Sequence, residues 1–442
     1  MTDKHPAGLA EPEVGSYFVA NYPPFSVWTR EAAAADALAA LDASPAAVPL
    51  GVYLHIPFCR KRCHFCYFRV YTNKNAQQVE RYLDLLVREW ELLSSRRALD
   101  GRRIDFVYVG GGTPSFLSTA QLRGLVSRLT AATPWTGAEE ITFECEPGTL
   151  TDAKLAVIRE LGVTRLSLGV ENFDDGILEL NGRAHRSPEI ARAYDAARAL
   201  DFPQINIDLI AGMLGETDAN WTRTVERTLA LDPDSVTIYQ MELPFNTTIS
   251  ADMLKGTGQF EHHVASWDTR RRWMREAFEA LERGGYTIGS AYTAVKDPSR
   301  TKFLYRDRLW EGADLAALGV ASFGHVNGVH MQNLDTWEAY EAALDTGQLP
   351  LGRAYRPSED ERLIRELVLQ LKRGVIRPQY FAGKFGVDVS DRFDVQWRRL
   401  EADRYLAERS ADRIALSREG LLRVDTLLPL FFRDEHRNVR YT

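Results

Sequence analysis

From residue 48 onward, short apolar runs alternate with longer stretches that have a helical pattern. The runs are VPLGVYLHIP at 48–57, IDFVYVG at 104–110, EEITFECEP at 139–147, TRLSLGVEN at 164–172, QINIDLIAG at 204–212 and SVTIYQMEL at 235–243. Between and after them the sequence predicts helices at 76–95, 118–132, 151–161, 187–200, 218–230 and 263–284. Continuous Val, Ile and Leu runs that alternate with helices are typical of a parallel sheet with helices outside it.

Six such units are too few to close a complete eight-stranded barrel. We therefore predict an α/β fold class, with an open, partial (β/α)6 barrel over residues 48–350. In parallel α/β folds the reacting groups lie at the carboxyl ends of the strands. Each unusual residue cluster of this sequence falls at such an end, which places the predicted site there.

Two flanking segments lack this alternation. Residues 1–47 form an N-terminal segment with one Ala-rich helix predicted at 30–42, which Pro45 ends. After residue 355 the pattern predicts three helices, a short hairpin and a final helix, so 355–442 is expected to be a small C-terminal winged-helix-like domain. Because its first helix is acidic, we expect this domain to be a packing module and not a DNA-binding one.

Composition and charge limit the classes of partner. The chain has 442 residues, of which 45% are hydrophobic and 26% charged, and its net charge is −7. This charge argues against nucleic acid or an anionic membrane surface as the main partner. No apolar run approaches the roughly 18 residues of a membrane helix, and the N-terminus has no signal-peptide pattern. We expect a cytoplasmic protein without membrane contact.

Three of the four cysteines stand within eight positions of the sequence. Cys59, Cys63 and Cys66 form a C-x3-C-x2-C pattern directly after the first predicted strand. A structural zinc site takes four ligands, usually as two separated pairs. His64 could complete a Cys3His set, although a residue adjacent to one ligand rarely does. Cys145 lies inside a predicted strand, where we expect a core residue.

An iron–sulfur cluster explains the number three better than zinc does. A four-iron cluster normally takes four thiolates, so three leave one iron open to a small molecule. The C-x3-C-x2-C spacing after a strand is typical of radical S-adenosylmethionine (SAM) enzymes, in which the open iron binds SAM and an electron from the cluster cleaves it. We interpret the cysteines as ligands of a [4Fe–4S] cluster, with zinc as the alternative.

A glycine-rich turn ends the second predicted strand. Gly110, Gly111 and Gly112 precede Thr113 and Pro114. A glycine run lets the backbone approach a ligand closely, and exposed N–H groups there would suit a carboxylate such as that of methionine. The alternative is a tight turn with no ligand.

Two carboxylates end the third predicted strand. Glu144 and Glu146 share one face by the two-residue period of a strand. They could accept hydrogen bonds from ribose hydroxyls or an ammonium group. The alternative is a pair of solvated charges.

At this point the sequence resembles the oxygen-independent coproporphyrinogen III oxidases and their relatives within the radical SAM superfamily. The resembling stretches run in family order over roughly residues 50–330; they are YLHIPFCRKRCHFCYF, VYVGGGTPSFL, ITFECEPGTL, LSLGVENF, LNGRAH, NIDLIAGMLGET and ALGVASFGHVNG. The segment GSYFVANYPPFSVW resembles an N-terminal segment found in the true oxidases, and the C-terminal part is similar to the family's winged-helix domain.

The resemblance implies roles for individual residues. It implies that Cys59, Cys63 and Cys66 hold the cluster. For the cluster-bound SAM it implies contacts from Tyr53, Gly111 and Glu144 and a backbone contact from Phe323. A second SAM would be bound by the residues at the matching positions, which are Phe65, Gly112, Thr113, Glu171, Arg183, Asp208 and Met241. Without the resemblance, Arg183 and Asp208 could be a structural ion pair.

Three positions depart from the oxidase pattern. Phe68 stands where the oxidases have a fourth, non-ligand cysteine. Glu171 replaces a glutamine, and Met241 replaces an alanine. All three lie in the region of the second SAM and the substrate, so they bear on the reaction and leave the cluster untouched.

Three functions remain open from the sequence. The first is oxidative decarboxylation of coproporphyrinogen III, a step of porphyrin biosynthesis, with a tetrapyrrole as the small-molecule substrate. The second is a radical C-methylase or cyclopropanase in which a second SAM supplies the carbon. The third is a haem-binding chaperone with His325 as an axial ligand. Arg60, Lys61 and Arg62 could receive an acidic electron donor such as flavodoxin or could simply solvate the loop.

Overall fold

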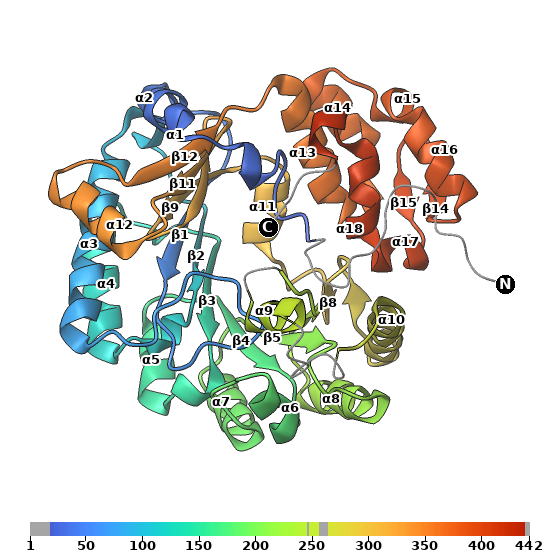
Figure 1. Ribbon diagram of the computed structural model, residues 1–442, viewed down its shortest axis with the longest axis horizontal. Coiled ribbons are helices and arrows are strands. Elements are labelled where there is room, and N and C mark those ends of the chain that lie inside the picture. The colour runs from blue at the N-terminus through green and yellow to red at the C-terminus, as the bar shows by residue number, and fades with distance from the viewer. Residues whose placement is uncertain (1–17, 245–246, 256–263, 438–442) are drawn as a thin grey trace.

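A single twisted sheet with helices along its outer face dominates the molecule (Figure 1). The computed structural model describes residues 18–244, 247–255 and 264–437. The parallel strands are β1 (Leu50–Ile56), β2 (Phe106–Gly111), β3 (Glu140–Cys145), β4 (Arg165–Glu171), β5 (Gln204–Ala211), β6 (Ser235–Gln240) and β9 (Asp314–Leu318). The six predicted strands are confirmed, and the predicted α/β fold with its open, partial barrel is correct.

The sheet is wider than six strands because antiparallel strands extend both edges. In the described part of the chain the strand order is β12-β11-β10-β9-β1-β2-β3-β4-β5-β6-β8-β7. The added strands are β7 (Thr287–Ile288), β8 (Thr293–Val295), β10 (Phe323–Val326), β11 (Val329–Asn333) and β12 (Leu351–Tyr355). β9 was not predicted, and it pairs in parallel with β1, so it adds a seventh parallel strand beside the cysteine-bearing unit.

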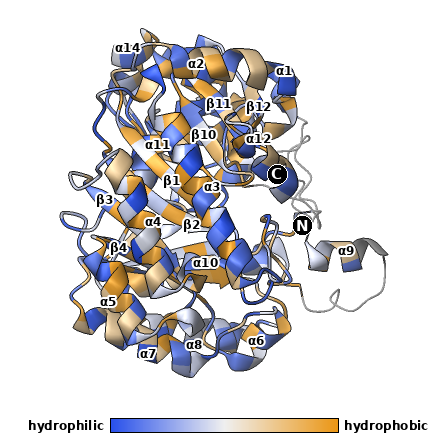
Figure 2. Cartoon of the chain, turned by 90° about the vertical axis from the view of Figure 1, so that its left-hand side faces the viewer, coloured by the Kyte–Doolittle hydropathy of each residue, from blue (hydrophilic) through white to orange (hydrophobic). Residues whose placement is uncertain are grey.

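The helices that follow the strands mostly lie outside the sheet; the exception is Leu304–Trp310, whose Tyr305 packs on Tyr53 and Tyr108 at the inner face. These helices are α3 (Ala76–Ser94), α4 (Thr119–Ala132), α5 (Asp152–Glu160), α6 (Asp175–Leu180), α7 (Ser187–Ala199), α8 (Asp218–Leu231), α9 (Thr248–Lys255), α10 (Trp267–Arg283), α11 (Leu304–Trp310) and α12 (Trp337–Asp345). Side-chain caps fix several starts: Asn75 and Ser118 form capping boxes at α3 and α4. Apolar residues follow the strands and the inward helix faces (Figure 2).

The predicted helix at 30–42 is present, with an irregularity. It runs as α1 (Arg30–Ala32), a π-helical stretch (Ala33–Ala37) and α2 (Leu38–Asp42). Thr29 caps its start and also pairs with Ala354 of β12 through two main-chain hydrogen bonds. The N-terminal segment is therefore attached to the edge of the sheet. Residues 1–17 of this segment lie outside the described residues. Residue 263, where the predicted helix 263–284 was expected to start, also lies outside the described residues. The observed helix α10 begins at Trp267.

The C-terminal region has its own apolar core. It contains α13 (Glu359–Leu371), β13 (Val375–Ile376), α14 (Pro378–Phe385), α15 (Val389–Arg392), α16 (Asp394–Ala402), β14 (Leu406–Arg409), β15 (Ile414–Leu416), α17 (Arg418–Leu422) and α18 (Val424–Leu427). The final helix, predicted as continuous, is broken at Arg423, which has non-helical dihedral angles. The three helices and the hairpin are as predicted, while the domain boundaries themselves stay a prediction.

A short stretch near the N-terminus, which we call the strap (residues 18–28), joins this second core. Val19 and Tyr22 are buried in it beside residues of α13 and α18. Lys372, at the end of α13, is buried with its side chain 1% exposed; its Nζ donates to the Val19 carbonyl at 2.7 Å and pairs with Asp425 at 2.8 Å. Asp425 also accepts hydrogen bonds from the Val19 N–H and the Tyr292 hydroxyl. One buried ion pair thus connects strap, barrel and C-terminal region.

None of the described helices is both long enough and apolar enough to cross a lipid bilayer.

Breaking the buried pair is expected to be costly. Lys372→Met would leave the Asp425 carboxylate buried without its cation, and we expect a loss of about 3–5 kcal/mol in the free energy of unfolding. The matched control is Lys296→Met, whose partner Asp232 and own side chain are about half exposed, with an expected loss below about 1 kcal/mol. Urea denaturation followed by circular dichroism measures both. Equal losses would contradict this account of the strap.

Candidate functional site

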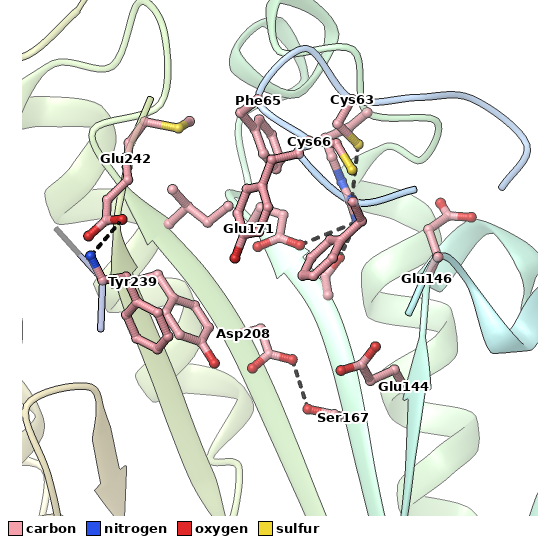
Figure 3. Close-up of a pocket in the computed structure, with 18 of the residues that line it drawn as sticks. Cys63, Phe65, Cys66, Glu144, Glu146, Ser167, Glu171, Asp208, Tyr239 and Glu242 are labelled. Atoms are coloured by element: carbon pink, nitrogen blue, oxygen red, sulfur yellow. Dashed lines mark hydrogen bonds and ion pairs between the residues drawn. The ribbon is translucent and has the colours of Figure 1, made fainter. Parts of the chain in front are cut away.

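A cavity of about 480 Å³ lies at the carboxyl ends of the parallel strands. Its wall combines the cysteine loop after β1, the ends of β2 to β6, the strap residue Phe18 and the segment Leu422–Thr426. In Figure 3, Cys63 and Cys66 lie on one side, Tyr239 and Glu242 lie on the other, and Glu171 and Asp208 lie between them. The structure brings together every predicted site residue except Tyr53 and Phe323.

The three clustered cysteines share one wall of the cavity. Main-chain hydrogen bonds close the base of their loop, from the Tyr71 N–H to the Pro57 carbonyl at 2.7 Å and from the Cys59 N–H to the Tyr71 carbonyl at 3.1 Å. The loop therefore leaves and rejoins the same place, and its thiols are held over the sheet. Burial raises the pKa of the Cys66 thiol to about 11, so the thiolate needs a bound metal to stabilise it near neutrality.

The donor set fits a cluster better than a single metal ion. No group of three or more His, Cys, Asp or Glu side chains lies close enough together to hold one metal ion among the residues that the structure describes. His64, the candidate fourth zinc ligand, directs its Nδ1 to the Leu180 carbonyl at 2.9 Å. Cys145 is buried in the core as predicted, 4% exposed. The thiols of Cys59, Cys63 and Cys66 come from one loop and line the same cavity, which suits a four-iron cluster.

A buried arginine lies beside the cysteines. Arg183 donates through Nη1 to the Cys63 sulfur at 3.4 Å and through Nη2 to the Gly169 carbonyl at 2.7 Å. Its Nε is buried and has no hydrogen-bond acceptor in the described part of the chain. The Glu171 carboxylate, 3.5 Å from Nη2, and the Cys63 sulfur are the anionic or polarisable partners of this buried guanidinium.

The expected role of the glycine turn is wrong in one respect. The N–H groups of Gly112 and Thr113 donate to the carbonyls of Ile56 and Phe58, both at 2.8 Å, and the Gly111 N–H donates to Glu144 at 3.1 Å. None of the three is exposed for a ligand carboxylate. The glycine is needed for close packing, since a Cβ at Gly112 would lie 2.9 Å from backbone atoms of the cysteine loop. The turn positions that loop.

The two glutamates of β3 have separate roles. Glu144 accepts hydrogen bonds from the Tyr108 hydroxyl and the Gly111 N–H, and burial raises its pKa to about 7. Glu146 pairs with Arg60 at 3.0 Å and with His185 at 3.1 Å. Burial acts to raise the pKa of Glu146, but the His185 hydrogen bond and nearby cations outweigh it and hold that pKa below its usual value. The Glu146 carboxylate is thus already paired with Arg60 and His185 and is not open to a ligand hydroxyl or ammonium group.

Three polar residues form the centre of the cavity. Arg183 pairs with Glu171 at 3.5 Å and not with Asp208, so the simple ion pair considered from the sequence is not formed. Glu171 has a positive φ of 64°, which is unusual for a residue other than glycine, and burial raises its pKa to about 7. Asp208 accepts hydrogen bonds from Ser167 at 2.8 Å and Asn206 at 2.9 Å. The other predicted contacts here, Phe65 and Met241, also line the wall.

Two predicted residues lie apart from this cavity. The Tyr53 hydroxyl meets His55 Nδ1 at 3.2 Å, and the Tyr53 ring stacks on Tyr108 at 6.0 Å inside the barrel. The Phe323 ring packs on Phe25 of the strap at 4.3 Å. The role predicted for Phe323 is a backbone contact, which this side-chain position does not test.

The candidate haem ligand is not placed for that role. His325 is buried, 8% exposed, and its Nδ1 meets His330 Nδ1 at 2.9 Å. It is not part of the cavity wall. The haem-chaperone hypothesis therefore lacks its predicted ligand in this structure.

Sequence reasoning missed the wall opposite the cysteines. It comprises Phe18, Tyr239, Gln240, Glu242, Trp267, Arg271, Tyr292 and the residues Leu422, Arg423, Asp425 and Thr426. These side chains come from five separate stretches of the chain and form no local motif. No pattern in the sequence singled out this wall.

The basic triplet of the cysteine loop is partly engaged. Arg60 pairs with Glu146, and Arg62 donates to the Cys66 carbonyl at 3.1 Å. Lys61 is exposed at the cavity rim. The suggested docking of an acidic electron donor on this triplet stays a prediction.

Comparison with known proteins agrees with this site. The model of the radical SAM superfamily matches residues 53–228. The chain is 30% identical to an oxygen-independent coproporphyrinogen III oxidase of Pseudomonas aeruginosa, over 90% of this chain and 89% of that protein. It is 26% identical to the heme chaperone HemW of Bacillus subtilis, over 84% of this chain and 96% of that protein.

A solved structure shares the fold. The coproporphyrinogen III oxidase HemN of Escherichia coli superimposes with a TM-score of 0.81 and 23% identity, covering 94% of this chain and 96% of that one. The likeness therefore extends beyond the barrel to the flanking segments.

The cysteine assignment predicts a specific pattern of loss. Cys59→Ala, Cys63→Ala and Cys66→Ala should each remove most of the iron and the visible absorption after anaerobic reconstitution, because three thiolates are the minimum for this cluster. Cys145→Ala is the control and should keep both. Iron and sulfide analysis with electron paramagnetic resonance measures the outcome. Full iron content in any of the three variants would overturn the assignment of that ligand.

Proposed function

We propose that this chain, which belongs to the radical SAM superfamily and within it to the family of oxygen-independent coproporphyrinogen III oxidases, converts propionate side chains of a coproporphyrinogen to vinyl groups. As a member of that superfamily it is an oxidoreductase whose cofactors are a [4Fe–4S] cluster and SAM. When bound, these cofactors supply a 5′-deoxyadenosyl radical by reductive cleavage of SAM.

In this proposal, different residues of the cavity bind the cluster, the SAM bound to the cluster and a second SAM. Cys59, Cys63 and Cys66 would hold the cluster, and the Glu144 carboxylate, which Tyr108 and Gly111 fix, would contact the SAM bound to that cluster. Gly111 and Tyr53 shape that side of the barrel, and Phe323 contributes through its backbone. Around Arg183, a second SAM would meet Phe65, Gly112, Thr113, Glu171, Asp208 and Met241.

One observation carries the choice of substrate. The cavity runs from the cysteines to a wall that the strap and the C-terminal region complete, and the similarity to the Pseudomonas aeruginosa oxidase spans 90% of the chain, more than the barrel alone. Cations stand around this space, with Lys61 and Arg62 on the cysteine loop and Arg271 and Arg423 opposite. Such a distribution suits a ring system with several carboxylate side chains.

The reaction requires a hydrogen atom and an electron to leave the substrate. Hydrogen abstraction from a propionate carbon, loss of carbon dioxide and loss of one electron to an acceptor leave a vinyl group. The radical of this reaction would have to be kept from water.

The first test is turnover of the tetrapyrrole. We expect anaerobically reconstituted protein, given SAM, a strong reductant and coproporphyrinogen III, to yield a product that has lost carboxyl mass, together with 5′-deoxyadenosine. Mass spectrometry measures both. Unchanged porphyrinogen with continued formation of 5′-deoxyadenosine would retain the radical SAM assignment and reject the substrate.

A second candidate function is carbon transfer from a second SAM. The observation that favours it is the Glu171–Arg183 pair at 3.5 Å, which puts a carboxylate where the family pattern has a neutral glutamine. Phe68, in place of the oxidases' cysteine, adds an aromatic face to the cavity beside Tyr67. Both changes alter the substrate half of the site and leave the cysteines as they are.

Isotope transfer separates the two candidates. With SAM labelled as the S-trideuteromethyl compound, carbon transfer predicts deuterium in 5′-deoxyadenosine and formation of S-adenosylhomocysteine, because the hydrogen comes from the second SAM. Oxidative decarboxylation predicts neither, because the hydrogen comes from the propionate. Mass spectra of the nucleoside products decide, and deuterium incorporation would move carbon transfer to first place.

A further inference from the structure

His64 stands between two of the three clustered cysteines in the sequence and faces away from the cavity. Its neighbours Cys63 and Phe65 line the cavity, whereas His64 does not. Its Nδ1 meets the Leu180 carbonyl at 2.9 Å. Because a carbonyl oxygen can only accept a hydrogen bond, Nδ1 carries the hydrogen and donates it. The side chain that the zinc alternative would have used is thus bound to another part of the chain.

His64 contacts one short loop through both its side chain and its backbone. This loop, which we call the arginine loop (residues 180–183), starts at the end of α6. The His64 N–H donates to the Asn181 carbonyl at 3.1 Å. The His64 ring packs on Gly182, where a Cβ would lie 3.0 Å from the ring, and the φ of Gly182 is 75°, which favours glycine. The two loops therefore fit closely together at His64.

The arginine loop is itself anchored to the barrel. The Asn181 side chain is fully buried; it donates to two main-chain carbonyls at 2.8 Å and 3.1 Å and accepts from a main-chain N–H at 3.0 Å. The loop ends at Arg183, whose Nη1 donates to the Cys63 sulfur at 3.4 Å. His64 thus connects the cysteine loop to an anchored segment, one residue away from the sulfur that Arg183 contacts.

His64 is also held through its own carbonyl. That carbonyl accepts hydrogen bonds from the N–H groups of Thr248 and Ile249, at the start of α9, at 3.0 Å and 3.3 Å. These two bonds and the bond from the His64 N–H involve the backbone alone. A substitution of the side chain therefore leaves them in place and removes mainly the bond to Leu180.

A hydrogen bond to a ligand sulfur affects how easily an iron–sulfur cluster is reduced. Reduction adds a negative charge to the cluster, so a donor and a positive charge beside a ligating sulfur stabilise the reduced form. Arg183 offers both to Cys63. Because Arg183 and Cys63 belong to different loops, their contact depends on the bonds that hold these loops together, and His64 supplies one of them with its side chain.

We propose that His64 is a positioning residue that holds the cysteine loop on the arginine loop, so that Arg183 donates to the Cys63 sulfur of the bound cluster and raises the reduction potential of that cluster. His64 acts through Arg183 and takes no part in bond making. The proposal rests on the proposed assignment of the three cysteines as cluster ligands, and it holds for any substrate.

The test compares two variants of His64 in the reconstituted holoprotein without SAM. His64→Phe keeps a ring against Gly182 and loses the donor. At a fixed solution potential we expect its ratio of reduced to oxidised cluster to fall about three- to tenfold, which is the range of one hydrogen bond. His64→Asn keeps an N–H donor near the place of Nδ1, so its ratio should stay close to that of wild type. Anaerobic redox titration followed by electron paramagnetic resonance measures the ratio.

A double variant tests whether His64 acts through Arg183. Arg183→Met removes the donor and the charge and should lower the ratio further than His64→Phe does. The double variant His64→Phe/Arg183→Met should then be no lower than Arg183→Met alone, because the contact that His64 supports is already absent. His436→Phe is the control: it also removes a histidine hydrogen bond, to Glu361 at 2.9 Å in the C-terminal region, and should leave the ratio unchanged.

The outcomes are distinct. An unchanged ratio in His64→Phe with full iron content overturns the proposal, and so does a double variant in which the two effects add. A ratio in His64→Asn as low as that in His64→Phe would show that the hydrogen bond is not the cause. Loss of iron from both His64 variants would overturn it as well, since His64 would then be needed to hold the cluster itself. If coproporphyrinogen III is not converted, the proposed substrate is wrong, while these ratios still decide the role of His64.

Discussion

The candidate site depends on two main-chain hydrogen bonds between the glycine turn and the cysteine loop. The N–H groups of Gly112 and Thr113 bind the carbonyls of Ile56 and Phe58, which lie at the end of β1 and at the base of the loop. This contact needs a residue without a side chain, because a Cβ at Gly112 would collide with the loop backbone. With it, three cysteines that are close in sequence point into one space. The bonds of Tyr71 to Pro57 and Cys59 close the same loop from its other end.

A second constraint completes the cavity from the opposite side. The buried Lys372–Asp425 pair draws the strap onto the C-terminal region, and Phe18 and the segment 422–426 thereby become part of the wall. The substrate space is thus built from both ends of the described chain. A barrel alone would leave this side open to solvent, whereas radical chemistry needs an enclosed site.

The sequence predicted the parts of the site that are local. Continuous apolar runs located β1 to β6, and the spacing of Cys59, Cys63 and Cys66 located the cluster wall. It did not predict β9 or the antiparallel edges, whose strands are short and lie beside charged or histidine-containing stretches. The sequence analysis also predicted wrongly that the N–H groups of the glycine turn face a ligand. No sequence pattern shows which backbone N–H will donate to Glu144 or to the Ile56 carbonyl.

The wall opposite the cysteines could not be predicted from the sequence, for a different reason. Phe18, Tyr239, Gln240 and Leu422 come together only through tertiary packing, and none of them belongs to a motif. The departures of Phe68 and Glu171 from the oxidase pattern were visible in the sequence, but their meaning needed the structure.

The charge balance at the centre of the cavity connects these points. Glu171 pairs with Arg183, which donates a hydrogen bond to the Cys63 sulfur, while Asp208 and Glu144 accept hydrogen bonds from neighbouring strands. Burial raises the pKa of both Glu144 and Glu171 to about 7, so near neutrality each carboxyl can be either charged or protonated. A bound sulfonium would favour the charged forms, since opposite charges at short range stabilise ionised carboxylates. The acidic centre is therefore suited to cationic SAM.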